Sequence, residues 1–107
     1  MPGERLADFA FAGPVIEWRG PAPFYFVAIP EARTGNVRYA AHHASYGWGV
    51  VPVTATIGEI AFTTALFPRD GGYLLPLKDA VRRRANIVVG DEVTVGLRIY
   101  AATAVRK

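Results

Sequence analysis

The stretch Tyr73–Val95, which begins YLLPLKDAVRRRANIVVGDEV, constrains the fold more than any other part of the chain. It contains a short apolar run, a basic segment in which Leu77, Val81 and Ala85 recur every four positions, a Gly-Asp pair and a second apolar run. A spacing of four places these three side chains on one face of a helix, whereas the flanking runs are typical of strands. The stretch therefore predicts a strand, a helix over residues 78–86 and a final strand after the Gly-Asp turn.

Short apolar runs separated by turn residues make up most of the remaining chain. Runs that are bounded by Gly and Pro and rich in β-branched or aromatic residues are typical of strands. Taken together, they predict strands at residues 6–18, 24–29, 50–57, 59–67, 73–77 and 92–101. An alanine-rich segment from Glu31 to about Ser45 predicts a second helix. We expect this helix to break near Gly35, because glycine costs about 1 kcal/mol inside a helix.

The run 59–67 has apolar side chains at both its even and its odd positions. The even positions include Phe62 and the odd positions include Phe67. A strand that is apolar on both faces is normally covered on both. We therefore expect a central strand that is buried on both sides and joined to the preceding run by a tight turn at Gly58-Glu59.

Six predicted strands and two short helices in 107 residues fit one domain, residues 1–107. Apolar residues make up 51% of the chain and charged residues 20%, which excludes a disordered chain. A small sheet hides its edges best by closing, so the sequence predicts a mainly β fold, a small closed barrel of six or seven strands with two short helices. The chain has no cysteine, and no apolar run approaches the roughly 20 residues of a membrane helix. We therefore expect a cytoplasmic protein without thiolate chemistry or membrane contact.

Several motifs in combination make the chain resemble an uncharacterised bacterial family known only as a domain of unknown function. These motifs are GPVIEWRGPAPFYFVAIP near the start, followed by TIG, TALFP, YLLPLKDAVR and GDEV. The family commonly has a tryptophan where this chain has Phe62 and a serine where it has Ala65. The resemblance covers nearly the whole chain, although no single motif is specific.

This resemblance implies a double-split β-barrel, the fold class of AbrB-type transition-state regulators. Leu75-Pro76, the basic helix and Gly90-Asp91 are similar to the AbrB order of strand, helix and Gly-Asp turn. Members of the resembled family often carry a second domain of the bacteriocin-protection type, and we expect none within residues 1–107. The resemblance implies no established activity and no catalytic residues.

Positive charge gathers in the C-terminal third of the chain. The formal net charge is +3, of which residues 69–107 contribute +4 and the rest −1. Its densest cluster is the best candidate for contact with an anion or a nucleic acid: Lys78, Arg82, Arg83 and Arg84. The alternative is a solvated helix end, where arginines complement the helix dipole and their stems cover apolar surface.

No arrangement of side chains indicates catalysis. His42 and His43 are neighbours, so on a helix their side chains point about 100° apart, which is poor geometry for one metal ion. Ser45 is the only serine and lacks the Gly-x-Ser-x-Gly context of a nucleophile elbow. We therefore expect no enzymatic activity, no cofactor and no metal site.

Aromatic residues beside Gly- and Pro-rich turns form the second candidate site. Trp18, Tyr25, Trp48 and Tyr73 are candidates for the rim of a ligand site, although most aromatics of a small barrel belong to its core. The sequence thus favours a non-enzymatic binding or interaction module, with nucleic-acid binding through residues 78–84 as the alternative. A small ligand, a protein and a nucleic acid stay open as partners. We expect a monomer rather than a dimer, because the predicted strands suffice to close a barrel.

Overall fold

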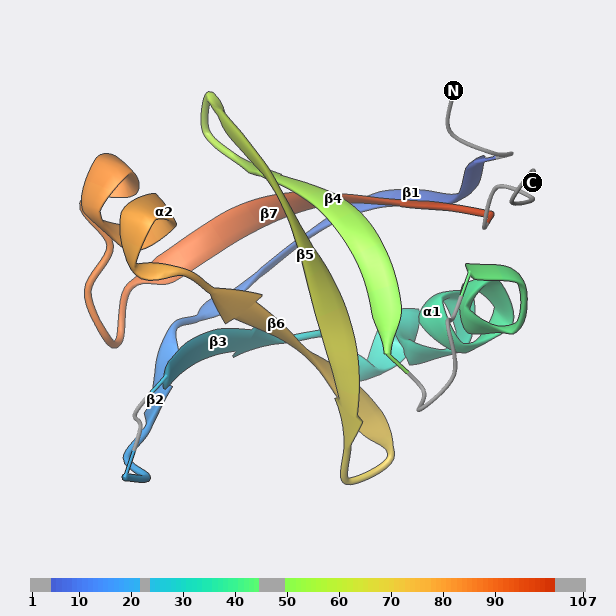
Figure 1. The fold of residues 1–107 in the computed structure, drawn as a ribbon, viewed down its shortest axis with the longest axis horizontal. Helices are drawn as coiled ribbons and strands as arrows, with labels where there is room; N and C mark the ends of the chain where they lie inside the picture. The colour runs from blue at the N-terminus through green and yellow to red at the C-terminus, as the bar shows by residue number, and fades with distance from the viewer. Residues whose placement is uncertain (1–4, 22–23, 45–49, 102–107) are drawn as a thin grey trace, which may run out of the picture.

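The computed structural model describes residues 5–21, 24–44 and 50–101, and these form a seven-stranded antiparallel sheet that curls around its core (Figure 1). The strands are β1 (Arg5–Pro14), β2 (Ile16–Trp18), β3 (Phe24–Ala28), β4 (Val51–Ile57), β5 (Ile60–Arg69), β6 (Gly72–Leu77) and β7 (Glu92–Tyr100). The helices are α1 (Glu31–Ala44) and α2 (Asp79–Ala85). The mainly β class, the upper strand number of seven and the two helices are therefore confirmed.

The strands follow the order β1-β7-β4-β5-β6-β3-β2, and β5 joins the two halves of the sheet. Residues 60–66 of β5 pair with β4, and residues 67–69 pair with β6. The order has two ends, β1 and β2, so the sheet is an open half-barrel instead of the closed barrel that we expected.

Both edges of the sheet belong to one run of chain, interrupted only at Val15. The backbone N–H of Val15 donates to the carbonyl of Asp91 at 2.8 Å, and its carbonyl accepts from the N–H of Gly90 at 2.9 Å. These bonds tie the junction of β1 and β2 to the turn before β7. The chain thus passes at Val15 from one edge of the sheet to the other, and the two edge strands do not pair with each other.

The core lies inside the curl and takes every second side chain of the strands, as a period of two requires. In β7, Val95, Leu97 and Ile99 are fully buried. Val81 of α2 faces the core as its spacing predicts, and Leu77, which the structure places at the end of β6, is buried as well. No helix in the described part of the chain is long and apolar enough to cross a membrane.

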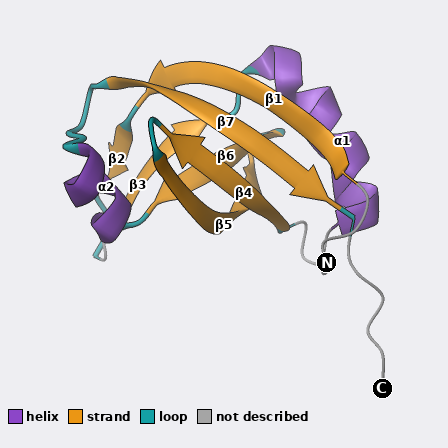
Figure 2. Ribbon diagram, turned by 90° about the horizontal axis from the view of Figure 1, so that it is seen from above, coloured by secondary structure: helices purple, strands orange, loops and turns teal. Residues whose placement is uncertain are grey.

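The two helices lie at opposite ends of the curled sheet (Figure 2). The predicted break in α1 is wrong, since the helix runs through Gly35 without interruption. Val37 and Ala40 are fully buried against the sheet. Burying one valine stabilises by about 1.5–3 kcal/mol, which exceeds the cost of one helical glycine. Helix α2 ends as expected at Asn86, which adopts the left-handed conformation with φ 56°.

Both hairpin turns are tight. The predicted turn at Gly58-Glu59 is confirmed by the pairing of the residues on either side of it. The next turn is shorter than the gap at residues 68–72 between the two predicted strands, because Pro68 is part of β5 and pairs with Tyr73. A proline fits there because pairing with β4 has already ended, so no ladder bond needs its missing N–H. Asp70 and Gly71 form the turn with φ 52° and 81°, the left-handed pair of a type I′ hairpin.

Candidate binding surface

The outer surface of four strands carries aromatic side chains that the core does not use. Residues directly opposite each other in an antiparallel pair lie on the same face of a sheet. The register pairs Ile16 with Phe26 and Trp18 with Phe24, and the face continues across β6 to Phe67 of β5. We call this set the aromatic face: Ile16, Trp18, Phe24, Phe26, Phe67, Arg69, Leu74 and Pro76.

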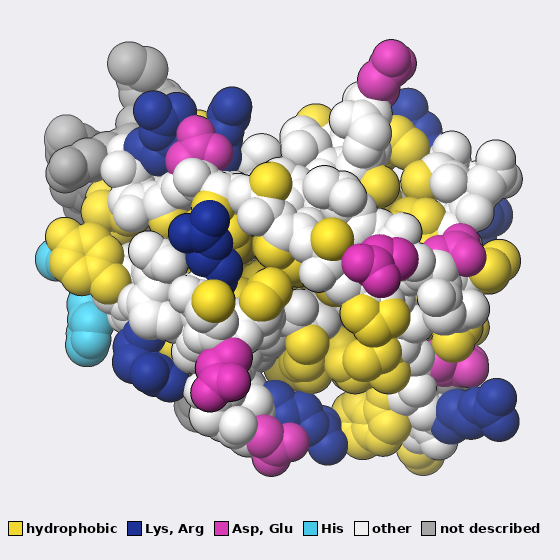
Figure 3. All heavy atoms as spheres, turned by 180° about the vertical axis from the view of Figure 1, so that it is seen from behind, with side chains coloured by type: hydrophobic (Ala, Val, Ile, Leu, Met, Phe, Trp, Pro, Cys, Tyr) yellow, Lys and Arg dark blue, Asp and Glu magenta, His cyan; other side chains and the backbone are white. Residues whose placement is uncertain are grey.

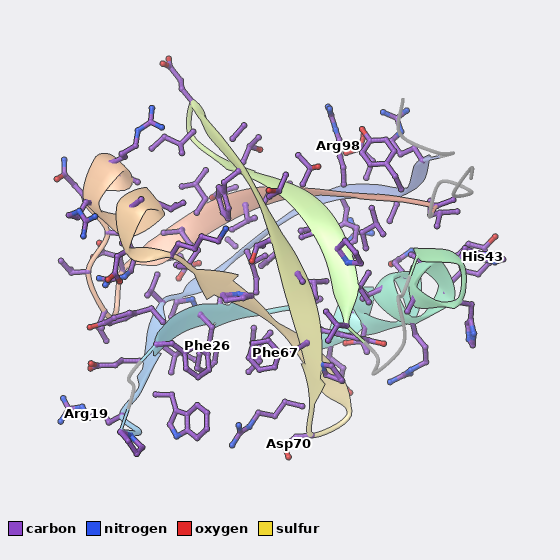
Figure 4. All side chains as sticks on the ribbon, in the orientation of Figure 1. Arg19, Phe26, His43, Phe67, Asp70 and Arg98 are labelled. Carbon is purple, nitrogen blue, oxygen red and sulfur yellow. The ribbon has the colours of Figure 1, made fainter. Side chains whose placement is uncertain are left out.

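The rings of the aromatic face touch one another. The ring of Phe24 is at the centre, with centroids 5.2 Å from Trp18, 5.4 Å from Phe26 and 5.8 Å from Phe67. Trp18 meets Phe24 edge to face, a favoured geometry for aromatic pairs. Trp18 is nevertheless 49% exposed and Ile16 is 41% exposed. Figure 4 shows Phe26 of β3 and Phe67 of β5 projecting on the same side of the sheet, on either side of β6. The result is one contiguous apolar surface that solvent reaches.

Arginines border the aromatic face. The guanidinium of Arg69 lies over the indole of Trp18, 4.9 Å from the ring centroid. Arg19, directly after β2, is 86% exposed at its side chain. Each has an acidic neighbour at long range: Arg19 Nε donates a hydrogen bond of 3.4 Å to Glu17 Oε1, and Asp70 Oδ2 is 3.8 Å from Arg69 Nε. Exposed pairs of this kind contribute little, so both guanidinium groups are open to a ligand.

A space-filling view from behind shows the same combination, with hydrophobic side chains gathered in its lower part and basic side chains on both sides of them (Figure 3).

The open face corrects the expectation that β5 is covered on both sides. Ala61 and Thr63 are exposed and Phe67 is only half-buried, whereas Leu66 is fully buried. The two helices cover the ends of the curl and leave much of its outer surface bare (Figure 2). The odd positions of β5 therefore face outward, and the last of them, Arg69, borders the aromatic face.

The structure does not bring the predicted rim residues together. Trp18 lies on the aromatic face, whereas Tyr25 alternates with its neighbours and points to the other side of β3. Tyr73 belongs to the core with 9% exposure. Trp48 lies outside the described residues.

The predicted basic cluster on α2 is divided between two roles. Arg82 lies over the ring of Tyr25, 3.5 Å from its centroid, and its Nη2 donates to Asp79 Oδ1 at 2.6 Å. The Arg82 side chain is 20% exposed, and its buried Nε has no partner among the described residues. This arginine therefore clamps α2 to β3 instead of offering its charge to an anion, the role for which the sequence made it a candidate. The other three members are exposed: Lys78, Arg83 and Arg84.

The histidine pair lies on the exposed side of α1, where the ring of His43 is 5.4 Å from that of Tyr39. Figure 4 places His43 far from the aromatic face. Within residues 5–21, 24–44 and 50–101, no three His, Cys, Asp or Glu side chains gather in a way that could hold a metal ion. Ser45 lies outside this part of the chain.

A small pocket opens on the outer surface of the other half of the sheet. It holds about 140 Å³ and is lined by Asp8, Thr54, Thr56, Gly96, Leu97 and Arg98. Asp8 is already paired, with its Oδ2 3.2 Å from Arg5 and 3.6 Å from Arg98. This pocket has no exposed aromatic ring in its lining, so we regard the aromatic face as the stronger candidate for a ligand.

Comparison with known proteins finds a relative and a family. NADH-quinone oxidoreductase subunit N of Salinispora tropica (strain ATCC BAA-916 / DSM 44818 / JCM 13857 / NBRC 105044 / CNB-440) is 38% identical over 71 residues. These residues are 64% of this chain, which covers only 14% of the length of that protein. The family described as Domain of unknown function (DUF1905) matches residues 11–97, a range that contains the whole aromatic face. The predicted resemblance to an uncharacterised family is thereby confirmed, and the chain belongs to the DUF1905 family.

Proposed function

We propose that this domain is a non-enzymatic binding module that holds its partner on the aromatic face. The observation that carries this proposal is the 49% exposure of Trp18 within a cluster of touching rings. Single exposed apolar residues are common, but a contiguous apolar surface rimmed by polar groups is typical of an interaction site. Tryptophan and arginine, which meet here in Trp18 and Arg69, are also the side chains most enriched where binding energy concentrates.

The similar segment in a much longer protein supports a module that works beside other domains. An AbrB-like, double-split barrel is the finer fold that we propose. Its support is the succession of β6 with Leu75-Pro76, then α2, then Gly90-Asp91 and β7. A cytoplasmic location and a monomeric state stay predictions of the sequence.

Nucleic-acid binding through α2 is the second candidate. Lys78, Arg83 and Arg84 are exposed and support it. The engagement of Arg82 with Tyr25 and Asp79 removes one of the four cations on which that hypothesis depended. The aromatic face, which combines exposed rings with two arginines of higher exposure, is therefore the stronger candidate.

A capture experiment with matched variants tests the proposal. The immobilised domain is exposed to an extract of cells that express it, and bound proteins and nucleic acids are identified by mass spectrometry and sequencing. Trp18→Ser combined with Phe26→Ser removes two rings of the aromatic face. Val88→Thr combined with Val89→Thr is the control, because these valines are 62% and 49% exposed next to α2.

We expect the wild type and the valine variant to retain the same partner, and the aromatic variant to lose it. Circular dichroism verifies that each variant is folded. Identical capture by the aromatic variant and the wild type would refute the proposal.

A further inference from the structure

We infer that the partner of the aromatic face is a single-stranded nucleic acid, whose bases stack on the rings while its phosphates meet Arg19 and Arg69. This inference rests on the proposed function, because it names the occupant of the same surface. Three features of the face carry it: the spacing of the rings, the position of the arginines and the weakly paired charges around them.

The rings form a platform of the kind that unpaired bases use. Trp18, Phe24, Phe26 and Phe67 come from three different strands, and neighbouring centroids are 5.2–5.8 Å apart. Sheets that bind single strands present aromatic side chains in this way, since every base has a flat surface that can stack. A duplex offers no such surface, because its bases already stack on each other. The chemistry therefore favours a single strand over a double one.

The arginines complete the platform at its border. Arg69 already stacks on Trp18 with a guanidinium that is partly open to solvent, as its 49% side-chain exposure indicates. Arg19 lies beyond the other side of the rings, and Figure 4 shows it at the end of the hairpin that carries Trp18. A strand laid across the rings can therefore place its phosphates against both cations.

The charge around the rings distinguishes a nucleic acid from an apolar protein surface. An apolar partner would have to bury Arg19 and Arg69 together with Glu17 and Asp70, which is costly for charged groups. A polyanion can exchange these long ion pairs for phosphate contacts with both arginines. The same guanidinium groups that oppose an apolar protein thus favour a phosphate backbone.

Fluorescence anisotropy of labelled oligonucleotides tests the inference. The probes are oligothymidylate and oligouridylate of about 12 nucleotides, within the usual site size of such platforms, and a duplex of equal length. Arg19→Gln combined with Arg69→Gln is compared with Arg83→Gln combined with Arg84→Gln, which removes the same charge from α2. Trp18→Ser tests the stacking separately.

We expect single strands to bind and the duplex to bind more weakly. Trp18→Ser should weaken binding by between about 5-fold and 100-fold. Two phosphate contacts give a slope of log affinity against log salt of about −1.4, which the Arg19/Arg69 variant should lose and the Arg83/Arg84 variant should keep.

Two other outcomes overturn the inference in different ways. Binding that depends on Arg83 and Arg84 but not on Trp18 would assign nucleic acid to α2. Absence of oligonucleotide binding, together with capture of a protein that depends on Trp18 and Phe26, would leave the proposed function intact and show that the occupant is a protein.

Discussion

The contact between Arg82 and Tyr25 decides whether the basic helix is mainly a structural element, and a double-mutant cycle measures it. The changes are Arg82→Met, Tyr25→Leu and both together. The guanidinium lies 3.5 Å from the ring centroid and its side chain is 20% exposed. A cation over an aromatic ring contributes about 0.5–1 kcal/mol at exposed sites and about 2 kcal/mol when desolvated. For this half-buried pair we therefore expect a coupling energy of about 1.5 kcal/mol.

The cycle is needed because the single change Arg82→Met mixes opposing effects. It removes the contact with the ring of Tyr25 and the ion pair with Asp79. The ion pair contributes about 0.3–0.5 kcal/mol. The substitution also removes the buried Nε that has no partner among the described residues, which returns about 1 kcal/mol or more. The coupling energy isolates the contact with the ring from these other terms.

Urea unfolding followed by circular dichroism measures the coupling, and thermal unfolding checks it. With an unfolding entropy of about 2.1 cal/mol/K per residue, 107 residues give a shift of about 7 °C for 1.5 kcal/mol. Arg83→Met is the matched control and should change stability by less than about 0.5 kcal/mol, because its side chain is exposed. A coupling below about 0.3 kcal/mol, or equal effects of Arg82→Met and Arg83→Met, would refute the structural role of Arg82.

Further predictions concern three glycines. Gly35→Ala should raise the free energy of unfolding by about 0.5–1 kcal/mol, because α1 is continuous there and a new Cβ meets nothing within 4 Å. Gly71→Ala should lower the free energy of unfolding by about 1 kcal/mol, because the φ of Gly71 is 81°. Gly96→Ala should lower it by about 1–3 kcal/mol, because its Cβ would lie 2.6 Å from Thr56 Oγ1. Adding Thr56→Ala to Gly96→Ala should restore most of that loss, as measured by urea unfolding. If the double variant were as destabilised as Gly96→Ala alone, this clash would not be the cause.

The fold could be predicted where one local pattern determined the outcome. In β7, apolar and polar residues alternate without exception from Val93 to Ile99, so only one face can be buried. In α2, the spacing of Val81 and Ala85, which continues that of Leu77 at the end of β6, likewise permits one orientation. These elements lie where the sequence places them because their own side chains decide which face points inward.

The sequence-based predictions were wrong where a contact with a distant segment determines the structure. Arg82 follows the buried Val81 directly, and only the ring of Tyr25, from β3, draws it toward the sheet. The continuity of α1 depends on burial of Val37 against strands far along the chain, which local propensity does not reveal. The prediction of a closed sheet was wrong for a similar reason, since pairing between distant strands is not visible in the local sequence.

The sequence contains a pattern that corresponds to the aromatic face, but this pattern alone does not predict an exposed surface. Trp18 lies on one parity of β2 with Ile16, and Phe24 lies on one parity of β3 with Phe26. Because Tyr25 makes the other parity of β3 apolar too, the sequence alone could not show which side faces solvent. The register between β2, β3 and β6 settles the question, and that register depends on pairing between distant segments.

Hydroxyl-radical footprinting of the protein in living cells and in purified form tests the binding role of the aromatic face most directly. The method works whatever the partner is, and Tyr39, which is 60% exposed on α1, is a control within the same molecule. We expect Trp18, Phe26 and Phe67 to be protected in cells while Tyr39 reacts equally in both samples. Equal reactivity of these three side chains in both samples, or protection confined to α2, would contradict the proposal that this face is the binding surface.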